Sequence, residues 1–202
     1  MIGGLMLCIL ACARPGPPAP GPAWTRPEYV PMALLHRDPA IARYRQDWYA
    51  RTLQALGEPS FQELARRPGQ AYRFLWLRHW HGAVSVRISR VGDLAVADAR
   101  TLSGRARFED QGGRLVEARR VTLAGADWLR LEAQLAAAGF WAAPAADPVD
   151  GGAEGARWVF EGVDDGRVHL VDRFSPDDPA LVELGLAFLA LAGLQVPERE
   201  VY

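Results

Sequence analysis

Three histidines and two carboxylates are the side chains in this sequence best suited to metal binding or proton transfer. His79 and His81 stand two residues apart at the end of a strand-like stretch, so both could point to one face of a sheet. His169 lies in a second such stretch, with Glu161 and Asp172 nearby in the sequence. Imidazole and carboxylate groups are suitable ligands for Zn²⁺. A zinc site would require the two stretches to be adjacent in the fold.

The surroundings of these histidines favour a simpler interpretation. His79 and His81 precede a turn at Gly82, where polar side chains are ordinary, and no HExxH spacing is present. Acidic residues between positions 147 and 165 could offer oxygen ligands to Ca²⁺, but the alternating spacing of a calcium-binding loop is missing. We therefore expect solvated turn histidines, no metal ion and no cofactor.

A second candidate polar site consists of charged or titratable residues within predicted strands. Its members are Arg73, Arg78, Glu161, His169 and Arg173. If the strands bring them to one face, an enzyme could use them without any recognisable motif. The alternative is an ordinary strand face of arginine–carboxylate pairs. The sequence identifies no catalytic residue, and whether the protein is an enzyme stays open.

Several other chemistries lack the residues that they need. Both cysteines, Cys8 and Cys12, lie in the first dozen residues, so the rest of the chain has no thiol. There is no GxSxG motif, and Ser175 before Pro176 is better explained as a helix cap. All 23 basic residues are arginines, mixed with 24 acidic residues for a net charge of -1, so we expect no nucleic-acid partner.

The N-terminus carries the features of a bacterial export signal. The apolar run from Ile2 to Ala11 is too short to span a membrane as a helix but suits the core of a signal peptide. The sequence Ile9-Leu10-Ala11-Cys12 resembles the lipobox of bacterial lipoproteins. The resemblance implies cleavage before Cys12 and lipidation of its thiol, which would anchor the chain in a membrane.

Alternatives to a lipoprotein remain open. Leu10 is large for its position and no basic residue precedes the apolar run, so the chain could also be secreted, keep an uncleaved anchor or start upstream. Ala13 stands where lipoproteins retained in the inner membrane carry Asp. The resemblance thus implies a location at the cell envelope facing the periplasm, with the outer membrane slightly favoured.

We divide the chain into a signal at 1–12, a proline-rich tether at 13–36 and one globular domain at 37–202. The stretch from Ala13 to Pro31 contains seven prolines, which favour extended polyproline conformations. At about 3.1 Å per residue it could hold the domain on the order of 50 Å from the bilayer. A tail without any spacing role is the other interpretation.

Periodicity and capping signals predict an α+β domain. We expect a helix at 39–56 that starts after Asp38, a short helix opened by a capping box at Ser60, and helices at 125–138 and from about 175 or 178 to 193. In the first helix, Ile41, Tyr44 and Trp48 should face the core and Arg45 should face away.

The β-strands are predicted in two groups. Four strands between residues 71 and 122 form an antiparallel meander with Tyr72, Phe74 and Trp76 facing the core, and a later hairpin turns at residues 164–166 (DDG). Strands joined by hairpins, with helices in separate stretches, indicate helices packed on an antiparallel sheet rather than a parallel doubly wound fold.

Short patterns in the domain resemble a set of uncharacterised bacterial exported proteins. They are RFLWLR at 73–78, WVFEG at 158–162 and RFSP at 173–176, and the resemblance covers residues 72–194. It implies no known activity. Read from the residues alone, these patterns are strands with alternating aromatic side chains.

Two functions remain after these exclusions. The first is a membrane-tethered, non-catalytic protein that binds or assembles with an envelope partner. The second is an envelope enzyme of unknown reaction. A concave pocket containing Arg73, Glu161 and His169 would favour the enzyme, whereas an exposed sheet with paired charges would favour docking.

Overall fold

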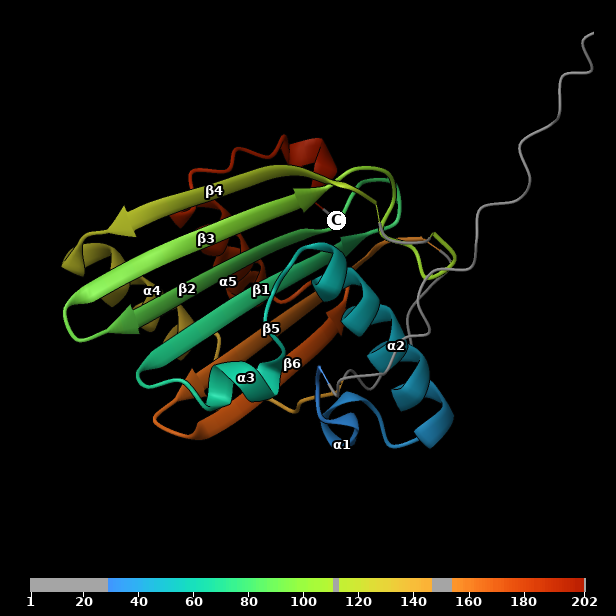
Figure 1. Cartoon of the computed structure of the whole chain (residues 1–202), viewed down its shortest axis with the longest axis horizontal. Helices are drawn as coiled ribbons and strands as arrows, with labels where there is room; N and C mark the ends of the chain where they lie inside the picture. The colour runs from blue at the N-terminus through green and yellow to red at the C-terminus, as the bar shows by residue number, and fades with distance from the viewer. Residues whose placement is uncertain (1–28, 111–112, 147–153, 202) are drawn as a thin grey trace, which may run out of the picture.

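The computed structural model describes residues 29–110, 113–146 and 154–201 (Figure 1). The predicted signal, Cys12 and most of the predicted tether lie outside these residues. The helices and strands are, in chain order, α1 (Met32–Leu35), α2 (Pro39–Ala55), α3 (Phe61–Ala65), β1 (Gln70–Arg78), β2 (Val84–Val91), β3 (Leu94–Leu102), β4 (Leu115–Leu123), α4 (Gly125–Ala137), β5 (Ala156–Asp164), β6 (Arg167–Phe174), α5 (Pro179–Leu191) and the short 3₁₀ helix η1 (Glu198–Glu200).

The strands form one antiparallel sheet of six, in the order β4-β3-β2-β1-β5-β6 (Figure 1). The α+β class is therefore confirmed. The predicted meander of four strands with a separate later hairpin differs in detail, because β5 pairs with β1 along its whole length and merges the hairpin into the same sheet. This long-range pairing makes β1 a central strand.

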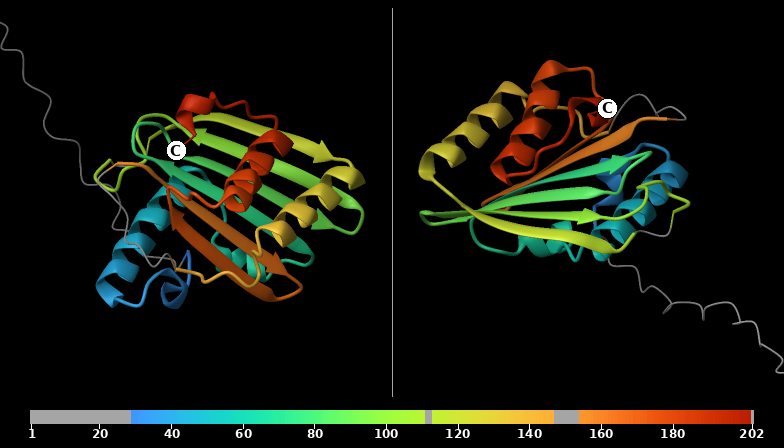
Figure 2. Two further views of the ribbon diagram at one scale, coloured as in Figure 1. Left: turned by 180° about the vertical axis from the view of Figure 1, so that it is seen from behind. Right: turned by 90° about the horizontal axis from the view of Figure 1, so that it is seen from above.

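Helices cover both faces of the sheet (Figure 2). On one face lie α4 and α5, and on the other lie α1, α2 and α3. Because side chains alternate along a strand, β1 contributes to both layers: Phe74 and Trp76 belong to the α4/α5 core, whereas Leu75 and Leu77 belong to the core under α1 and α2. The expectation that Phe74 and Trp76 face a core is confirmed.

Aromatic rings fill the α4/α5 side. The ring centroids of Phe74 and Phe160 are 4.8 Å apart, and those of Phe74 and Trp158 are 5.1 Å apart. Gly185 of α5 lies directly over this cluster, where an added Cβ would come within 2.2 Å of the Trp158 ring. A glycine at this point of α5 therefore lets the helix approach the sheet closely.

The local signals at the helix starts and at the hairpin are confirmed. The carboxylate of Asp38 accepts a hydrogen bond from the backbone N–H of Ala40, and Ser60 and Glu63 form the predicted capping box. In the β5–β6 turn, Asp165 and Gly166 have φ values of 44° and 85°, the left-handed conformations that a tight hairpin turn requires. These motifs act within a few residues, which is why the sequence alone revealed them.

The folded part begins before residue 37. Tyr29, Val30 and Leu35 are buried, and the backbone N–H of Phe61 donates to the carbonyl of Tyr29 at 2.8 Å. Residues 29–36, which we assigned to the tether, thus pack against the domain. Among the described residues, no helix is long and apolar enough to cross a membrane.

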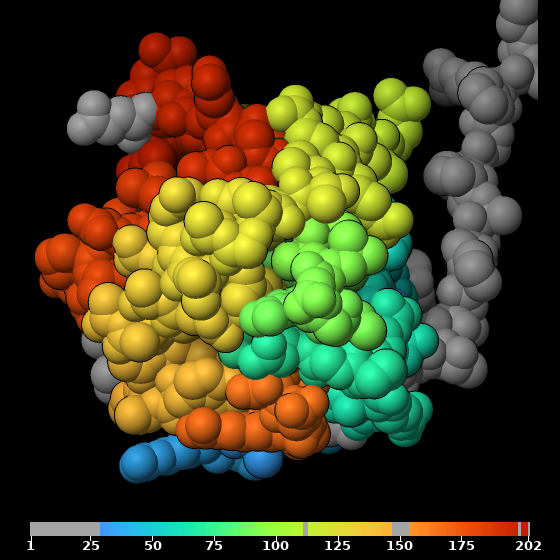
Figure 3. Space-filling model, turned by 90° about the vertical axis from the view of Figure 1, so that its left-hand side faces the viewer, coloured from blue at the N-terminus to red at the C-terminus, as the bar shows by residue number. Residues whose placement is uncertain are grey.

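The two ends of the sheet differ in what surrounds them. One end carries the β2–β3 and β5–β6 turns, and there α3, α4 and the turns lie side by side on the surface (Figure 3). At the opposite end, β1 finishes and β5 starts, beside the loop that joins β3 to β4. The open concave surface described below lies at this second end.

Candidate functional site

The predicted polar residues Arg73 and Glu161 form an ion pair in the interior. They are directly opposed on neighbouring strands β1 and β5, and the guanidinium Nε of Arg73 donates to the carboxylate Oε2 of Glu161. Arg73 is 0% exposed, and its Nη1 also donates to the carbonyl of Pro59 at 2.6 Å. The pair lies beneath the segment that joins α2 to α3, and solvent does not reach it.

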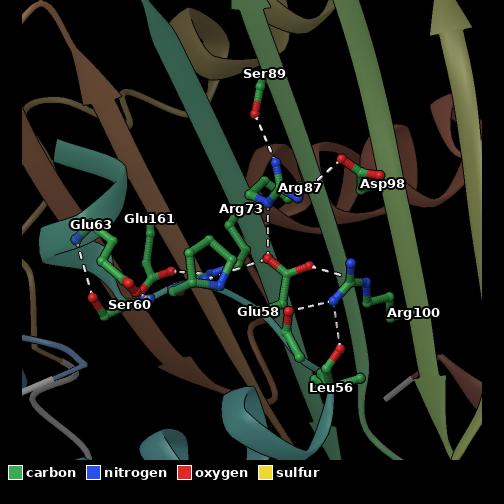
Figure 4. Close-up of polar contacts among 12 residues, drawn as sticks. Leu56, Glu58, Ser60, Glu63, Arg73, Arg87, Ser89, Asp98, Arg100 and Glu161 are labelled. Carbon is green, nitrogen blue, oxygen red and sulfur yellow. Dashed lines mark hydrogen bonds and ion pairs between the residues drawn. The ribbon is translucent and has the colours of Figure 1, made fainter. Parts of the chain in front are cut away.

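This pair belongs to a larger charge network (Figure 4). The carboxylate of Glu58, from the α2–α3 connection, lies 3.5 Å from the guanidinium of Arg73 and 2.9 Å from that of Arg87. Arg87 in turn contacts Asp98 at 3.0 Å, and Asp98 contacts Arg120 at 2.7 Å. We call these six residues, from Glu161 to Arg120 across the sheet, the β-row network.

Strand register explains why the β-row network forms. The opposed pairs Glu161–Arg73, Arg73–Arg87, Arg87–Asp98 and Asp98–Arg120 place one charged residue from each of five successive strands in a single line. Glu58 fills the gap where two arginines would otherwise face each other. Directly opposed like charges destabilise a sheet, so the loop carboxylate is required by the register.

Burial sets the protonation behaviour at the centre of the network. Burial raises the pKa of the Glu161 carboxyl, against the opposing effect of the Arg73 guanidinium. Glu58 Oε1, Arg73 Nη2 and Glu161 Oε1 are buried with no hydrogen-bond partner among the described residues. Each such atom carries a desolvation cost. The network therefore holds these segments together at a cost in desolvation. Its centre at Glu58, Arg73 and Glu161 is closed to solvent, whereas Arg120 at its end is exposed.

The other three members of the predicted site lie on the opposite face of the sheet. His169 Nε2 is 3.0 Å from the carbonyl of Ala143, and Arg173 donates to the carbonyl of Pro144 at 2.7 Å. Arg78 donates to the carbonyl of Gly82 at 3.1 Å. The expectation that strands could bring all five residues to one face is wrong, because their positions differ in parity along the paired strands.

His169 is a structural residue in its setting. Its ring packs edge-on to Phe140, with centroids 5.2 Å apart, beneath the chain that leaves α4. Burial lowers the pKa of the imidazole, and the positive charges of Arg167 and Arg173 add to that effect. No pocket found in the described part of the chain combines Arg73, Glu161 and His169. Its described residues also contain no group of three metal-ligating side chains.

A second buried charge cluster connects α2 to the sheet. Asp172 of β6 accepts hydrogen bonds from Tyr49 at 2.8 Å, Arg157 at 2.7 Å and Arg45 at 3.4 Å. Burial and the adjacent Asp172 carboxylate raise the pKa of the Tyr49 hydroxyl well above its ordinary value. Tyr49 therefore remains a donor at all physiological pH values and fixes α2 over β6.

This cluster explains a correction to the orientation of α2. We expected Tyr44 and Trp48 in the core and Arg45 on the outside, but Arg45 is 2% exposed and Tyr44 is 42% exposed. Arg45 faces inward because the carbonyl of Leu35 and the carboxylate of Asp172 accept its hydrogen bonds. The rotation turns Tyr44 and Trp48 toward the β3–β4 loop.

The rotated aromatic face forms one wall of a cleft whose volume is about 580 Å³. This size falls in the range of ligand-binding sites, roughly 300–1,000 Å³. The cleft lies at the end of the sheet between α2, the β3–β4 loop and the ends of β1, β5 and β6. Its lining consists of Ala40, Ile41, Tyr44, Arg45, Trp48, Leu77, His79, Ala106, Arg107, Phe108, Glu109, Glu154, Gly155, Arg157 and Phe174.

Aromatic contacts fix the wall between α2 and the β3–β4 loop. The rings of Tyr44 and Phe108 lie 4.1 Å apart, and the Arg51 guanidinium lies 4.4 Å from the Phe108 centroid. Trp48 Nε1 donates to the carbonyl of Ala106 at 3.1 Å, which ties the loop to the helix. The wall is therefore held in place before any ligand arrives.

Polar groups complete the cleft. Burial and the nearby Glu109 carboxylate raise the pKa of the Tyr44 hydroxyl, so it stays protonated and can donate a hydrogen bond. His79 lies at the end of β1, and the carboxylates of Glu109 and Glu154 are exposed at the rim. The described lining residues include no serine, threonine, cysteine or lysine, and the groups among them that could take part in proton transfer or nucleophilic attack are Tyr44, His79, Glu109 and Glu154. The arrangement suits recognition of an apolar surface that carries hydrogen-bond acceptors.

Sequence reasoning missed the cleft as a site. Tyr44 and Trp48 were assigned to the core because helical spacing of aromatics usually means core. A signal was present in the loop, where Phe108 stands between Arg107 and Glu109 in a segment with no strand or helix pattern. A large aromatic side chain in such a loop is expected to pack against another side chain, and here Phe108 packs against Tyr44.

Comparisons with known proteins add no identity to this geometry. No protein-family model, no curated protein and no solved structure matches the chain.

Proposed function

We propose that the protein is a non-catalytic binding domain of the cell envelope, with the aromatic cleft as its binding site. The observation that carries this proposal is the pre-formed wall of Tyr44, Trp48 and Phe108 around a cleft of about 580 Å³. Exposed aromatic side chains that are already held in place bind with little loss of conformational entropy. Such residues commonly dominate the energy of binding sites.

The distribution of charged residues supports binding over catalysis. The polar residues that could have served an enzyme are either buried in the β-row network or tied to backbone carbonyls on the opposite face. Their contacts explain them as parts of the fold. Among the described residues of the cleft lining, His79, Glu109 and Glu154 accompany no serine, threonine, cysteine or lysine.

The proposed location follows from the lipobox-like sequence before Cys12. Cleavage there and lipidation of the thiol would leave the domain tethered to a membrane through residues 13–28, facing the periplasm. The outer membrane is slightly favoured because Ala13 is not the retention residue Asp. In this setting the partner of the cleft is an envelope protein.

Photo-crosslinking in native membranes tests this function. A photoreactive phenylalanine analogue at Phe108 should capture a specific envelope protein, identified by mass spectrometry, because the ring lines the cleft. The matched control places the analogue at Leu186 on the exposed side of α5, which is 39% exposed and lies on the other face. Equal capture from both positions, or none from Phe108, contradicts a binding cleft.

The same sample tests the anchor. The mature N-terminal peptide should start at Cys12 and carry acyl chains, and the protein should sediment with membranes. A chain that keeps Met1 and stays in the aqueous fraction after cell breakage contradicts the envelope location. The two readouts are independent, so the cleft and the anchor can fail separately.

A further inference from the structure

We infer that the aromatic cleft binds the proline-rich segment 13–22 of the same chain, so that the tether docks onto its own domain. The inference rests on the proposed function of the cleft as a binding site. The segment reads ARPGPPAPGP and contains five prolines in ten residues. Such a sequence favours the extended polyproline helix before binding, which lowers the entropy lost on docking.

The chemistry of the segment matches the lining of the cleft. Proline-rich peptides dock in grooves lined by aromatic side chains, because pyrrolidine rings pack against flat π-faces. Tyr44, which is 42% exposed, and Phe174 line the cleft, whereas the Phe108 ring is already covered by Tyr44 and by the Arg51 guanidinium, 4.4 Å from its centroid. The rings of Tyr44 and Phe108 are tilted by 31° with centroids 4.1 Å apart, so the two side chains hold each other in place beside the cleft.

The hydrogen-bonding groups of the segment also match those of the cleft. Proline has no backbone N–H, so this segment mainly offers carbonyl oxygens, which need donors opposite them. The Tyr44 hydroxyl is held protonated by its surroundings and can donate to such a carbonyl. The His79 ring, at the cleft end of β1, also carries an N–H.

The chain is long enough to reach. The backbone N–H of Val30 donates to the side chain of Gln46 at 3.2 Å, which fixes the start of the fold against α2. Gln46 lies on the same helix turn as Tyr44 and Trp48, so the segment has only to pass around one helix, about 10–12 Å across. Residues 23–29 can span roughly 20 Å at about 3.1 Å per residue.

Carboxylates at the rim of the cleft can pair with the one charged residue of the segment. Arg14 precedes the first proline, and Glu109 and Glu154 are exposed at the rim. The arginines of the described lining, Arg45, Arg107 and Arg157, already pair with Asp172 or Asp110. Because Arg14 is two residues from the proposed lipidation site at Cys12, docking would bring the cleft close to the bilayer. Release would lengthen the tether to the order of 50 Å at about 3.1 Å per residue.

Tethering makes even a weak interaction sufficient. A short flexible connection gives an effective concentration in the millimolar range, so an intrinsic Kd near that value already populates the docked state. A partner must then compete with the segment. A partner that itself presents a proline-rich stretch would do so directly.

Photo-crosslinking within the purified full-length chain tests the docking. With the photoreactive analogue at Phe108, we expect crosslinks to residues 13–22, formed within one chain in a mixture of isotope-labelled and unlabelled protein. Replacing Pro17, Pro18, Pro20 and Pro22 by serine should reduce their yield at least fivefold. The analogue at Leu186 is the control and should give none of these crosslinks.

Three outcomes would overturn the inference. They are no crosslink to 13–22, crosslinks formed only between different chains, or a yield that the serine variant leaves unchanged. Failure here is distinct from failure of the proposed function. If Phe108 captures an envelope partner in membranes but never the segment 13–22, the cleft is a binding site and self-docking is wrong.

Discussion

The two faces of the sheet are packed with different kinds of side chain. On the α4/α5 face, Phe74, Trp158 and Phe160 fill the interface with aromatic rings. On the face under α1, α2 and α3, apolar residues share the interior with two buried charge clusters centred on Arg73 and Asp172. The first face derives its stability from burial of apolar surface, which needs little geometric precision beyond good packing.

This difference bears on where a binding site can form. Buried ion pairs contribute little net stability because desolvation offsets their attraction, but they are directional and fix segments relative to one another. Here they fix the α2–α3 connection over β1 and α2 over β6. The cleft lies where α2 has been oriented in this way.

The largest expected effect comes from breaking the β-row network at its centre. Arg73→Met leaves Glu161 buried without its partner, and we expect a loss of about 3–5 kcal/mol in the free energy of unfolding. Urea denaturation measures this loss. Arg130→Met is the matched control, because its ion pair with Asp127 is exposed at the surface and should matter by less than about 1 kcal/mol.

The double variant Arg73→Met/Glu161→Met sharpens the same test. Replacing both partners by apolar side chains removes the uncompensated charge, so most of the lost stability should return. A double variant as unstable as Arg73→Met alone would show that Arg73 stabilises the fold through contacts other than its ion pair with Glu161.

The apolar face should be sensitive to added volume. Gly185→Ala places a Cβ within 2.2 Å of the buried Trp158 ring, and overpacking of this kind costs about 1–3 kcal/mol. Thermal or urea unfolding measures it. Gly125→Ala is the control, since nothing lies within 4 Å of its added Cβ and this variant should be neutral or slightly more stable. Equal behaviour of the two variants would contradict the close approach of α5.

A smaller effect is expected at the capping box. Ser60→Ala removes the hydroxyl that accepts the N–H of Glu63 at 3.1 Å, and loss of such a cap costs about 1 kcal/mol. Because α3 connects to the Glu58 segment, the variant should also raise amide hydrogen exchange around residues 58–65. Loss of stability without any local rise in exchange would show that the cap does not hold this segment.

The smallest effect concerns pH. Burial lowers the pKa of His169 in the folded state, so the unfolded chain takes up the proton first as the pH falls. Stability should therefore be constant above the ordinary histidine pKa and should decrease as the pH falls from there through the lowered folded value. His169→Gln should flatten this part of the stability curve. An unchanged curve would mean that another group causes the dependence.

Local elements of this fold were predictable, and long-range pairing was not. Asp38, the Ser60 capping box and the Asp165-Gly166 turn each act within a few residues, and each was recognised correctly. The pairing of β5 with β1 joins residues about 90 positions apart. Nothing in the local pattern specifies such a pairing.

The prediction that the five polar residues share one face of the sheet was wrong for a related reason. Arg73 and Arg78 are five positions apart in one regular strand, so strict alternation already places them on opposite faces. The orientation of α2 could not be predicted, because an inward Arg45 makes sense only once Asp172 is known to lie beneath it. A buried charge is stable only with its partner, and the partner is 127 residues away.

The central claim is that the buried charges maintain the fold while the aromatic cleft carries the function. The most direct measurement compares two variants for capture of the envelope partner from Phe108 in native membranes. Tyr44→Ala should reduce capture at least fivefold while changing the free energy of unfolding by less than about 1 kcal/mol. The folded double variant Arg73→Met/Glu161→Met should capture the partner normally. Loss of capture in the double variant, with full capture in Tyr44→Ala, would contradict the account.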